Sequence, residues 1–268
     1  MQPFIRVHQL RQSFGTQEVL KGVSFDVGKG ELMALIGGSG AGKSVILKHL
    51  DGLMDPLERD GRRISGAPEK IKKQIRSKIG FMFQQGALFD SLSVGENVAF
   101  PLREAGIRDE NELDTRISAA LDSVGLLGQQ EKMPASLSGG MIKRVAVARA
   151  IITTPECLLY DEPTAGLDPI VTDSISFLIR QICKDKGITT VIVSHDMPSV
   201  IRIADKIVYL RNGEVYWTGT PEELLHSKDE ILQKFLYGDS GENWAALSGK
   251  NENFQRVLLE RAERERKQ

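Results

Sequence analysis

Residues 37–44 read Gly-Gly-Ser-Gly-Ala-Gly-Lys-Ser, which matches the phosphate-loop pattern G-x-x-x-x-G-K-[ST]. The loop follows an apolar run, residues 32–36, and precedes a helical stretch, residues 45–50. Glycines let the backbone curl so that its N–H groups point at a phosphate, and the following helix adds the positive end of its dipole. We therefore expect a nucleoside-triphosphate site built from Gly37, Gly38, Ser39, Gly40, Ala41, Gly42, Lys43 and Ser44.

Within this loop two side chains have distinct expected tasks. The pattern predicts that Lys43 reaches the β- and γ-phosphates of the nucleotide. It also predicts that the hydroxyl of Ser44 is a ligand of Mg²⁺.

From the run before the loop onward, short apolar runs alternate with helical patterns. The apolar runs are residues 32–36, 157–160 and 189–193. The helical patterns are residues 111–124, 140–152 and 170–184. Continuous apolar runs are typical of strands buried in a parallel sheet. The alternation predicts an α/β fold with a mostly parallel core sheet and an active site at the carboxyl ends of its strands.

Other segments depart from that alternation. Residues 5–10 and 23–27 read as short strands joined by turns. About residues 91–154 are helical without a clear buried strand, which indicates an inserted α-helical subdomain. The runs 207–210 and 215–218 flank Asn212-Gly213, a strong hairpin signal, and a helix is expected over residues 221–236.

The C-terminal part of the sequence changes in composition. Residues 238–252 are rich in Gly, Ser, Asp and Asn and read as a linker. After the linker, the last residues show a helical pattern with an apolar face. We expect one domain over residues 1–237 and a linker with a helical extension over residues 238–268. The extension is either a solvated helix or docks on a partner or sister chain.

The composition is that of a soluble globular protein: 268 residues, 41% hydrophobic and 26% charged. A formal charge of −1 gives no electrostatic reason to expect a nucleic-acid partner. Cys157 and Cys183 are too few for a disulfide framework, so a reducing compartment is favoured. We expect no signal peptide in residues 1–10 and no membrane-spanning segment, so any membrane role depends on a partner.

Two acids end the second apolar run, which reads Leu-Leu-Tyr-Asp-Glu over residues 158–162, the form of a Walker B segment. An unpaired buried carboxylate costs several kcal/mol, so acids at a strand end beside a phosphate site are plausible ligands of a metal or of water. We expect Asp161 to hold Mg²⁺, through water, and Glu162 to be the general base that polarises the attacking water.

A second glycine turn, Ser138-Gly139-Gly140, precedes the helix that carries Arg144 and Arg149. Free backbone N–H groups and a hydroxyl at a helix start form another anion site. One chain would then have two phosphate-binding turns but only one that carries the phosphate-binding lysine. The simplest arrangement is a homodimer in which this turn closes over the triphosphate held by the other subunit.

With these motifs, the chain resembles the ATP-binding cassette (ABC) ATPases over about residues 4–236. Besides the motifs above, the matching positions are Phe14, Gln84, the signature at 137–140, the D-loop at 165–168 and His195. The resemblance implies that Phe14 stacks on adenine and that Gln84 links Mg²⁺ and the attacking water to a membrane partner. It also implies that His195 contacts the γ-phosphate and that Asp168 acts across the dimer interface. The implied cofactors are ATP and Mg²⁺.

A narrower resemblance comes from residues 83–89 and 97–104 and from Met141, which replaces a Gln of the generic signature. These segments resemble the ATPase subunits of Mla/Mce-type lipid transporters, which carry phospholipids or other lipids between membranes. Residues 55–66 depart from the family pattern, so we expect a shortened antiparallel subdomain there. The apolar residues 86–89 are suited to receive a short helix of a transmembrane protein, although they could simply pack the helical subdomain.

The sequence thus predicts a peripheral ATPase on the cytoplasmic side of the inner membrane. It would drive a lipid-transport permease of the Mla type, together with an MCE-domain protein and, in some complexes, a STAS-domain protein. Two alternatives remain open: the ATPase of an importer for amino acids or another small solute, and a soluble cassette that acts as a scaffold without transport.

Overall fold

The computed structural model describes residues 3–52, 58–59, 62–63 and 68–237. Its strands are β1 (Ile5–Phe14), β2 (Gln17–Val27), β3 (Leu32–Gly37), β4 (Glu58–Arg59), β5 (Arg62–Arg63), β6 (Ile79–Met82), β7 (Cys157–Asp161), β8 (Thr189–Val193), β9 (Lys206–Arg211) and β10 (Glu214–Gly219). Its α-helices are α1 (Lys43–Leu50), α2 (Glu69–Arg76), α3 (Val94–Glu104), α4 (Glu110–Ser123), α5 (Gly139–Ile151), α6 (Pro169–Lys186), α7 (Met197–Ile203), α8 (Pro221–His226) and α9 (Glu230–Tyr237). The predicted linker and helical extension, residues 238–268, lie outside this description.

Two sheets organise the chain. The larger has the order β10-β9-β3-β8-β7-β6, in which β6, β7, β8, β3 and β9 are mutually parallel neighbours. The smaller has the order β2-β1-β4-β5 and is antiparallel. With the helices α3 to α5 inserted between β6 and β7, this arrangement confirms the predicted fold class. The strands β4 and β5 have two residues each, so the described part of the antiparallel sheet is short there.

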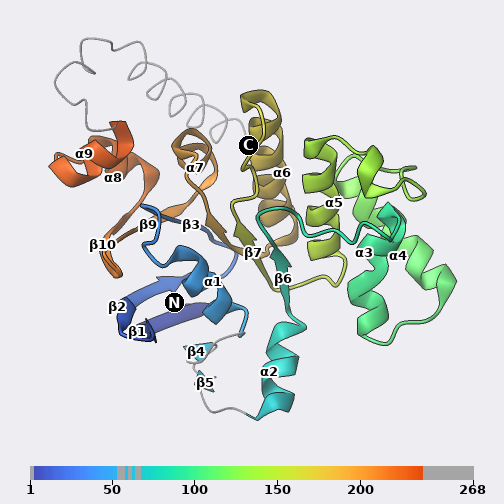
Figure 1. Ribbon diagram of the computed structural model, residues 1–268, viewed down its shortest axis with the longest axis horizontal. Coiled ribbons are helices and arrows are strands. Elements are labelled where there is room, and N and C mark those ends of the chain that lie inside the picture. The colour runs from blue at the N-terminus through green and yellow to red at the C-terminus, as the bar shows by residue number, and fades with distance from the viewer. Residues whose placement is uncertain (1–2, 53–57, 60–61, 64–67, 238–268) are drawn as a thin grey trace.

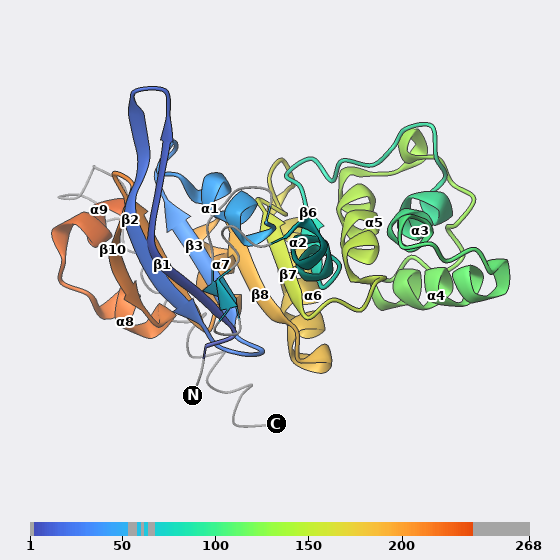
Figure 2. The ribbon, with the colours of Figure 1, turned by 90° about the horizontal axis from the view of Figure 1, so that it is seen from below.

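Strand β3 divides the core, because successive side chains of a strand point to opposite faces. Leu32, Ala34 and Ile36 pack with the cluster that contains α6 and α7. Met33 and Leu35 pack with the cluster that contains α1 and the β1–β2 hairpin. Figures 1 and 2 show these layers on either side of the large sheet, with α3, α4 and α5 at one end and α8 and α9 at the other.

The structure differs from the sequence-based expectation at β6 and in the helix expected over residues 221–236. Strand β6, Ile79–Met82, was not predicted, because its four residues include a glycine and follow a basic helix. The single helix expected over residues 221–236 is wrong, since the chain forms α8 and α9 instead. The break comes at Ser227, where α8 ends, and Asp229 then accepts hydrogen bonds from the amides of Ile231 and Leu232 at 2.9 and 3.0 Å.

The predicted hairpin between β9 and β10 is confirmed. Asn212 and Gly213 have φ angles of 54° and 84°, which is the left-handed pair that a tight hairpin turn requires.

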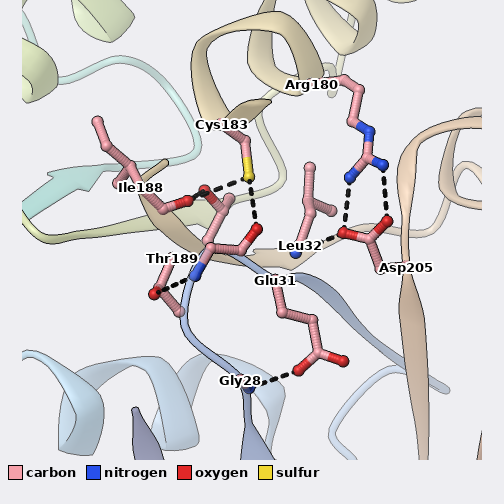
Figure 3. Close-up of polar contacts among 10 residues, drawn as sticks. Gly28, Glu31, Leu32, Arg180, Cys183, Ile188, Thr189 and Asp205 are labelled. Atoms are coloured by element: carbon pink, nitrogen blue, oxygen red, sulfur yellow. Dashed lines mark hydrogen bonds and ion pairs between the residues drawn. The ribbon is translucent and has the colours of Figure 1, made fainter. Parts of the chain in front are cut away.

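At the amino ends of the parallel strands a polar network joins α6 to β3 and β8 (Figure 3). Arg180 donates two hydrogen bonds of 2.6 Å to Asp205, whose carboxylate also accepts from the amide of Leu32 at 2.9 Å. Gly30 N–H donates to the Thr189 hydroxyl at 3.0 Å. These bonds fix the strand ends opposite the phosphate loop, so the carboxyl ends are left for the site.

Helix α3 begins with a capping box, in which Ser93 and Glu96 each bond the other's backbone amide. The buried side chain of Asn97, on the same helix, accepts from Phe89 N–H at 2.8 Å and donates to the carbonyls of Phe89, Leu92 and Ser93 at 2.9–3.0 Å. The segment that leads into α3 is therefore held by one amide side chain.

Gly80 sets the approach of β6 to α5, so we predict that Gly80→Ala destabilises the fold. A Cβ there would lie 2.1 Å from the carbonyl oxygen of Ala150 and 2.7 Å from Leu158 Cδ2. Overpacking of this kind lowers the free energy of unfolding by about 1–3 kcal/mol. The variant should therefore melt at a lower temperature than the wild type. Gly28→Ala is the control, since its nearest contact is an ordinary 3.4 Å to Glu31. Equal melting temperatures for the two variants would contradict the prediction.

Candidate nucleotide site

The phosphate loop lies at the carboxyl end of β3 and runs directly into α1. Gly42, before the helix, has a φ angle of +97°, and a Cβ there would lie 2.4 Å from Leu20 Cδ2. Only glycine meets both conditions. The first N–H groups of α1 have no acceptor inside the helix and carry the positive end of its dipole.

Lys43 is 6% exposed, and its ammonium group lies within the curl of the loop. It donates to the carbonyl oxygens of Gly37 at 2.8 Å and Gly38 at 2.9 Å. Burial lowers the pKa of Lys43, while the nearby carboxylates of Glu162 and Asp161 oppose that shift. A cation held in this way is placed to meet an anionic ligand.

A cavity of about 790 Å³ opens beside the loop at the carboxyl ends of β3, β7 and β8. Its lining brings together residues that are far apart in the sequence: Ser39, Gly40, Lys43, Ser44, Gln84, Asp161, Glu162 and His195. These are the residues expected to meet the phosphates, the metal and the attacking water. The cavity is polar where they gather and is large enough for the phosphates of a nucleotide.

Glu162 follows β7 with a φ angle of +49°, an uncommon conformation for a residue with a side chain. Its amide donates to the Val193 carbonyl at 2.9 Å, which ties the turn to β8. Its carboxylate faces His195: the His195 amide donates to Oε2 at 3.2 Å, and His195 Nε2 lies 3.0 Å from Oε1. The ring contact is a hydrogen bond when Nε2 carries a hydrogen.

The site shifts the acid–base properties of this pair. Burial raises the pKa of Glu162, while the His195 amide and Lys43 counteract the rise. Burial also lowers the pKa of His195, an effect strengthened by Lys43. A carboxylate with a raised pKa is a stronger base, which suits proton abstraction from water.

The donor set fits Mg²⁺. The Ser44 hydroxyl lies 3.3 Å from Asp161 Oδ1, so two hard oxygen donors are adjacent, and Gln84 lines the same cavity. No group of three or more His, Cys, Asp and Glu residues that could hold a metal occurs in the described part of the chain. The adjacent oxygens of Ser44 and Asp161 suit Mg²⁺, which takes few protein ligands and completes its shell with phosphate oxygens and water.

Several of the predicted residues do not line this cavity. Phe14 lies at the tip of the β1–β2 hairpin and is 48% exposed. Ser138 caps α5 by accepting from Met141 N–H at 3.3 Å, and Ser138 and Gly139 are exposed. Asp168 caps α6 and accepts from Ile170 and Val171. The residues of the signature turn therefore do not line the phosphate-loop cavity of their own chain.

Sequence reasoning missed two features near the loop. Lys143, in α5, is 6% exposed and donates to the backbone carbonyl of Gln84. The same helix carries Arg144 and Arg149, so no sequence pattern marked Lys143 as the buried cation. A second cavity, of about 520 Å³, lies along the other side of the loop and is lined in part by Val19 and Arg211. No sequence pattern marked Arg211.

The fold and this site together define a P-loop nucleoside-triphosphate hydrolase. Residues 20–165 match the family described as ABC transporter. The chain belongs to this family of ATP-hydrolysing subunits. None of its described helices is long and apolar enough to cross a bilayer.

Two relatives and one solved structure place the chain more finely. It is 40% identical over 256 residues to the protein TRIGALACTOSYLDIACYLGLYCEROL 3, chloroplastic, of Arabidopsis thaliana, covering 87% of this chain and 73% of the relative. It is 37% identical over 243 residues to the intermembrane phospholipid transport system ATP-binding protein MlaF of Haemophilus influenzae, covering 89% and 92%. A post-hydrolysis dimer of the ATP-binding cassette MJ0796, bound to ADP and Pi, is 30% identical with a TM-score of 0.73, covering 81% and 98%.

Proposed function

We propose that this chain is the ATPase subunit of a transporter that moves phospholipid or a related lipid between membranes. The similarity that carries this proposal is the one to the Haemophilus influenzae protein, because it spans 92% of a subunit named for phospholipid transport. The Arabidopsis thaliana relative, whose name refers to a glycolipid, supports the same substrate class.

In the proposed reaction, water attacks the γ-phosphorus of ATP and the bond to the β–γ bridging oxygen breaks. Glu162 accepts a proton from the attacking water, while His195 orients the Glu162 carboxylate and contacts the γ-phosphate. Lys43 gives up its hydrogen bonds to the carbonyls of Gly37 and Gly38 and donates to the β- and γ-phosphates instead. Ser44, Asp161 and Gln84 would hold Mg²⁺, which when bound neutralises charge on the phosphates.

The second half of the site would come from another copy of the chain. The turn at Ser138, Gly139 and Gly140, whose first two residues are exposed, would present the start of α5 to the triphosphate held by a second copy, with Asp168 at the interface. The dimeric state of the similar cassette supports this homodimer. ATP then closes the dimer, and hydrolysis reopens it.

A groove beside Gln84 would receive the permease. Its cavity, about 880 Å³, is lined by the rings of Phe81, Phe83, Phe89 and Phe100. Phe83, Phe89 and Phe100 are 46%, 42% and 37% exposed, and such a cluster of exposed rings marks a contact surface. A short apolar helix of an Mla-type permease fits it. The subunit would thus be peripheral on the cytoplasmic side of the inner membrane, in a complex with an MCE-domain protein and a STAS-domain protein.

Glu162→Gln tests the base assignment. The variant should bind ATP normally and hydrolyse it about 10²–10⁴-fold more slowly, because the amide cannot accept the proton. Lys43→Ala should fail earlier, at nucleotide binding. Fluorescent-nucleotide titration and phosphate release measure the two steps separately. Near-normal hydrolysis by Glu162→Gln would refute its role as base.

Mixing two inactive variants tests the shared site. Gly139→Asp places a carboxylate at the start of α5, where the helix dipole tolerates it but a phosphate does not. Combined with Lys43→Ala chains, it should regain up to about a quarter of wild-type activity, because half the dimers are mixed and each has one complete site. No recovery in dimers shown to be mixed would contradict completion of the site by a second chain.

Phe100→Asp tests the groove. It should keep the ATPase activity of the isolated subunit but lose recovery with membranes from cells that contain the permease, because a charge would replace a buried ring at the contact. Leu127→Asp is the matched control: Leu127 is 56% exposed and does not line the groove. Equal recovery of both variants would show that the permease docks elsewhere.

Copurification tests the substrate class. Recovery of the chain with a permease and an MCE-domain protein supports lipid transport. Recovery with a solute-binding protein would instead indicate the small-solute importer, and a chain that copurifies with no permease would indicate the scaffold.

A further inference from the structure

One face of α5 is occupied by the segment that follows β6. Ile142, Ala146 and Arg149 are spaced i, i+4 and i+7 in the helix, with Lys143 beside them, so all four project to one side. Residues 84–87 lie against that side. Gly86, with a φ angle of +77°, packs so closely that a Cβ would lie 3.2 Å from Ile142 Cγ2 and 3.5 Å from Ala146 Cβ.

Two cations hold this segment through its backbone. The Lys143 ammonium donates to the carbonyl of Gln84, and Arg149 donates to the carbonyls of Gly86 at 2.5 Å and Ala87 at 2.8 Å. Hydrogen bonds from charged donors are about twice as strong as neutral ones. Three carbonyls within four consecutive residues are therefore fixed to one helix.

Lys143 is the more unusual of the two, since it is only 6% exposed. Burial lowers its pKa, and the charge of Glu162 opposes that effect. The ammonium thus lies in the field of the Glu162 carboxylate while it holds the backbone of Gln84. Burying a lysine is costly unless its charge is paired. Here the ammonium bonds the Gln84 carbonyl and is stabilised by the charge of Glu162.

The direction of α5 gives the contact a wider effect. Its first residue, Gly139, belongs to the turn that would meet the triphosphate of the second subunit, whereas Gln84 lines the cavity that would hold the chain's own triphosphate. Lys143 is one turn into the helix from Gly139. A shift of residues 84–87 on binding or hydrolysis would therefore move the start of α5.

We propose that Lys143, with Arg149, couples the two nucleotide sites of the dimer by making residues 84–87 and the signature turn move as one body. This inference rests on the proposed dimer. Lys143 is a positioning residue in it, because it acts through the Gln84 backbone and through α5. Energetic coupling of two sites requires a physical element that both sites bias, and this pair of segments supplies one.

The test is the dependence of ATPase rate on ATP concentration, measured on the full chain. The wild type should show a Hill coefficient above 1. Lys143→Gln should lower it to about 1, since removing a coupling element changes the affinity of the second site by about 2- to 30-fold. Lys143→Arg should retain cooperativity. Lys132→Gln is the control. Lys132 is an exposed cation in the same helical region, so its removal should leave both the ATPase rate and the cooperativity unchanged.

A purely structural lysine would change the melting temperature and the amount of active protein, but not the Hill coefficient. If Lys143→Gln does not fold, Arg149→Lys is the second test. Two guanidinium nitrogens of Arg149 bond the carbonyls of Gly86 and Ala87, and a single ammonium nitrogen does not reproduce that geometry, so Arg149→Lys should lower the Hill coefficient. A non-cooperative wild type, or a folded Lys143→Gln that keeps the wild-type Hill coefficient, overturns the inference. Failure of the mixed-variant experiment would instead refute the dimer itself.

Discussion

The contact between Gly42 and Leu20 is the constraint on which the nucleotide site depends. Leu20 belongs to β2 of the antiparallel sheet and Gly42 to the loop that follows β3 of the large sheet, and there is no room for a Cβ between them. The antiparallel hairpin therefore presses the phosphate loop into its curled form and sets where α1 begins. Lys43 and Ser44 follow in the first turn, so their positions derive from packing between the sheets as much as from the glycines of the loop. Any looser contact would separate the lysine from the carboxylates of Asp161 and Glu162 at the end of β7.

The strands that carry the site could be predicted from the sequence because each is a continuous apolar run. β3, β7 and β8 are buried on both faces, and that burial leaves a pattern that composition alone reveals. β6 could not be predicted, since its environment comes from α5, which contacts it through Gly80. The break between α8 and α9 also escaped prediction, because a single capping aspartate interrupts an otherwise continuous helical pattern.

For the candidate site, the motifs predicted the cavity residues Ser39, Gly40, Lys43, Ser44, Asp161 and Glu162, and the family resemblance added Gln84 and His195. Neither source could give the left-handed turn at Glu162 or the pairing of its carboxylate with His195, because these features depend on how β7 and β8 align. The buried position of Lys143 also follows only from tertiary structure. The roles of Phe14, of the signature turn and of Asp168 remain predictions, since these residues lie outside the cavity of a single chain.

Asn97 has a consequence for recognition. By bonding Phe89, Leu92 and Ser93 at once, it holds one wall of the phenylalanine-lined groove in shape before any partner arrives. A surface that is already ordered loses little conformational entropy on association. Binding there would depend on how well the side chains of the partner complement a pre-formed groove. A permease whose helix does not match that shape would bind weakly, because the groove does not rearrange to accommodate it.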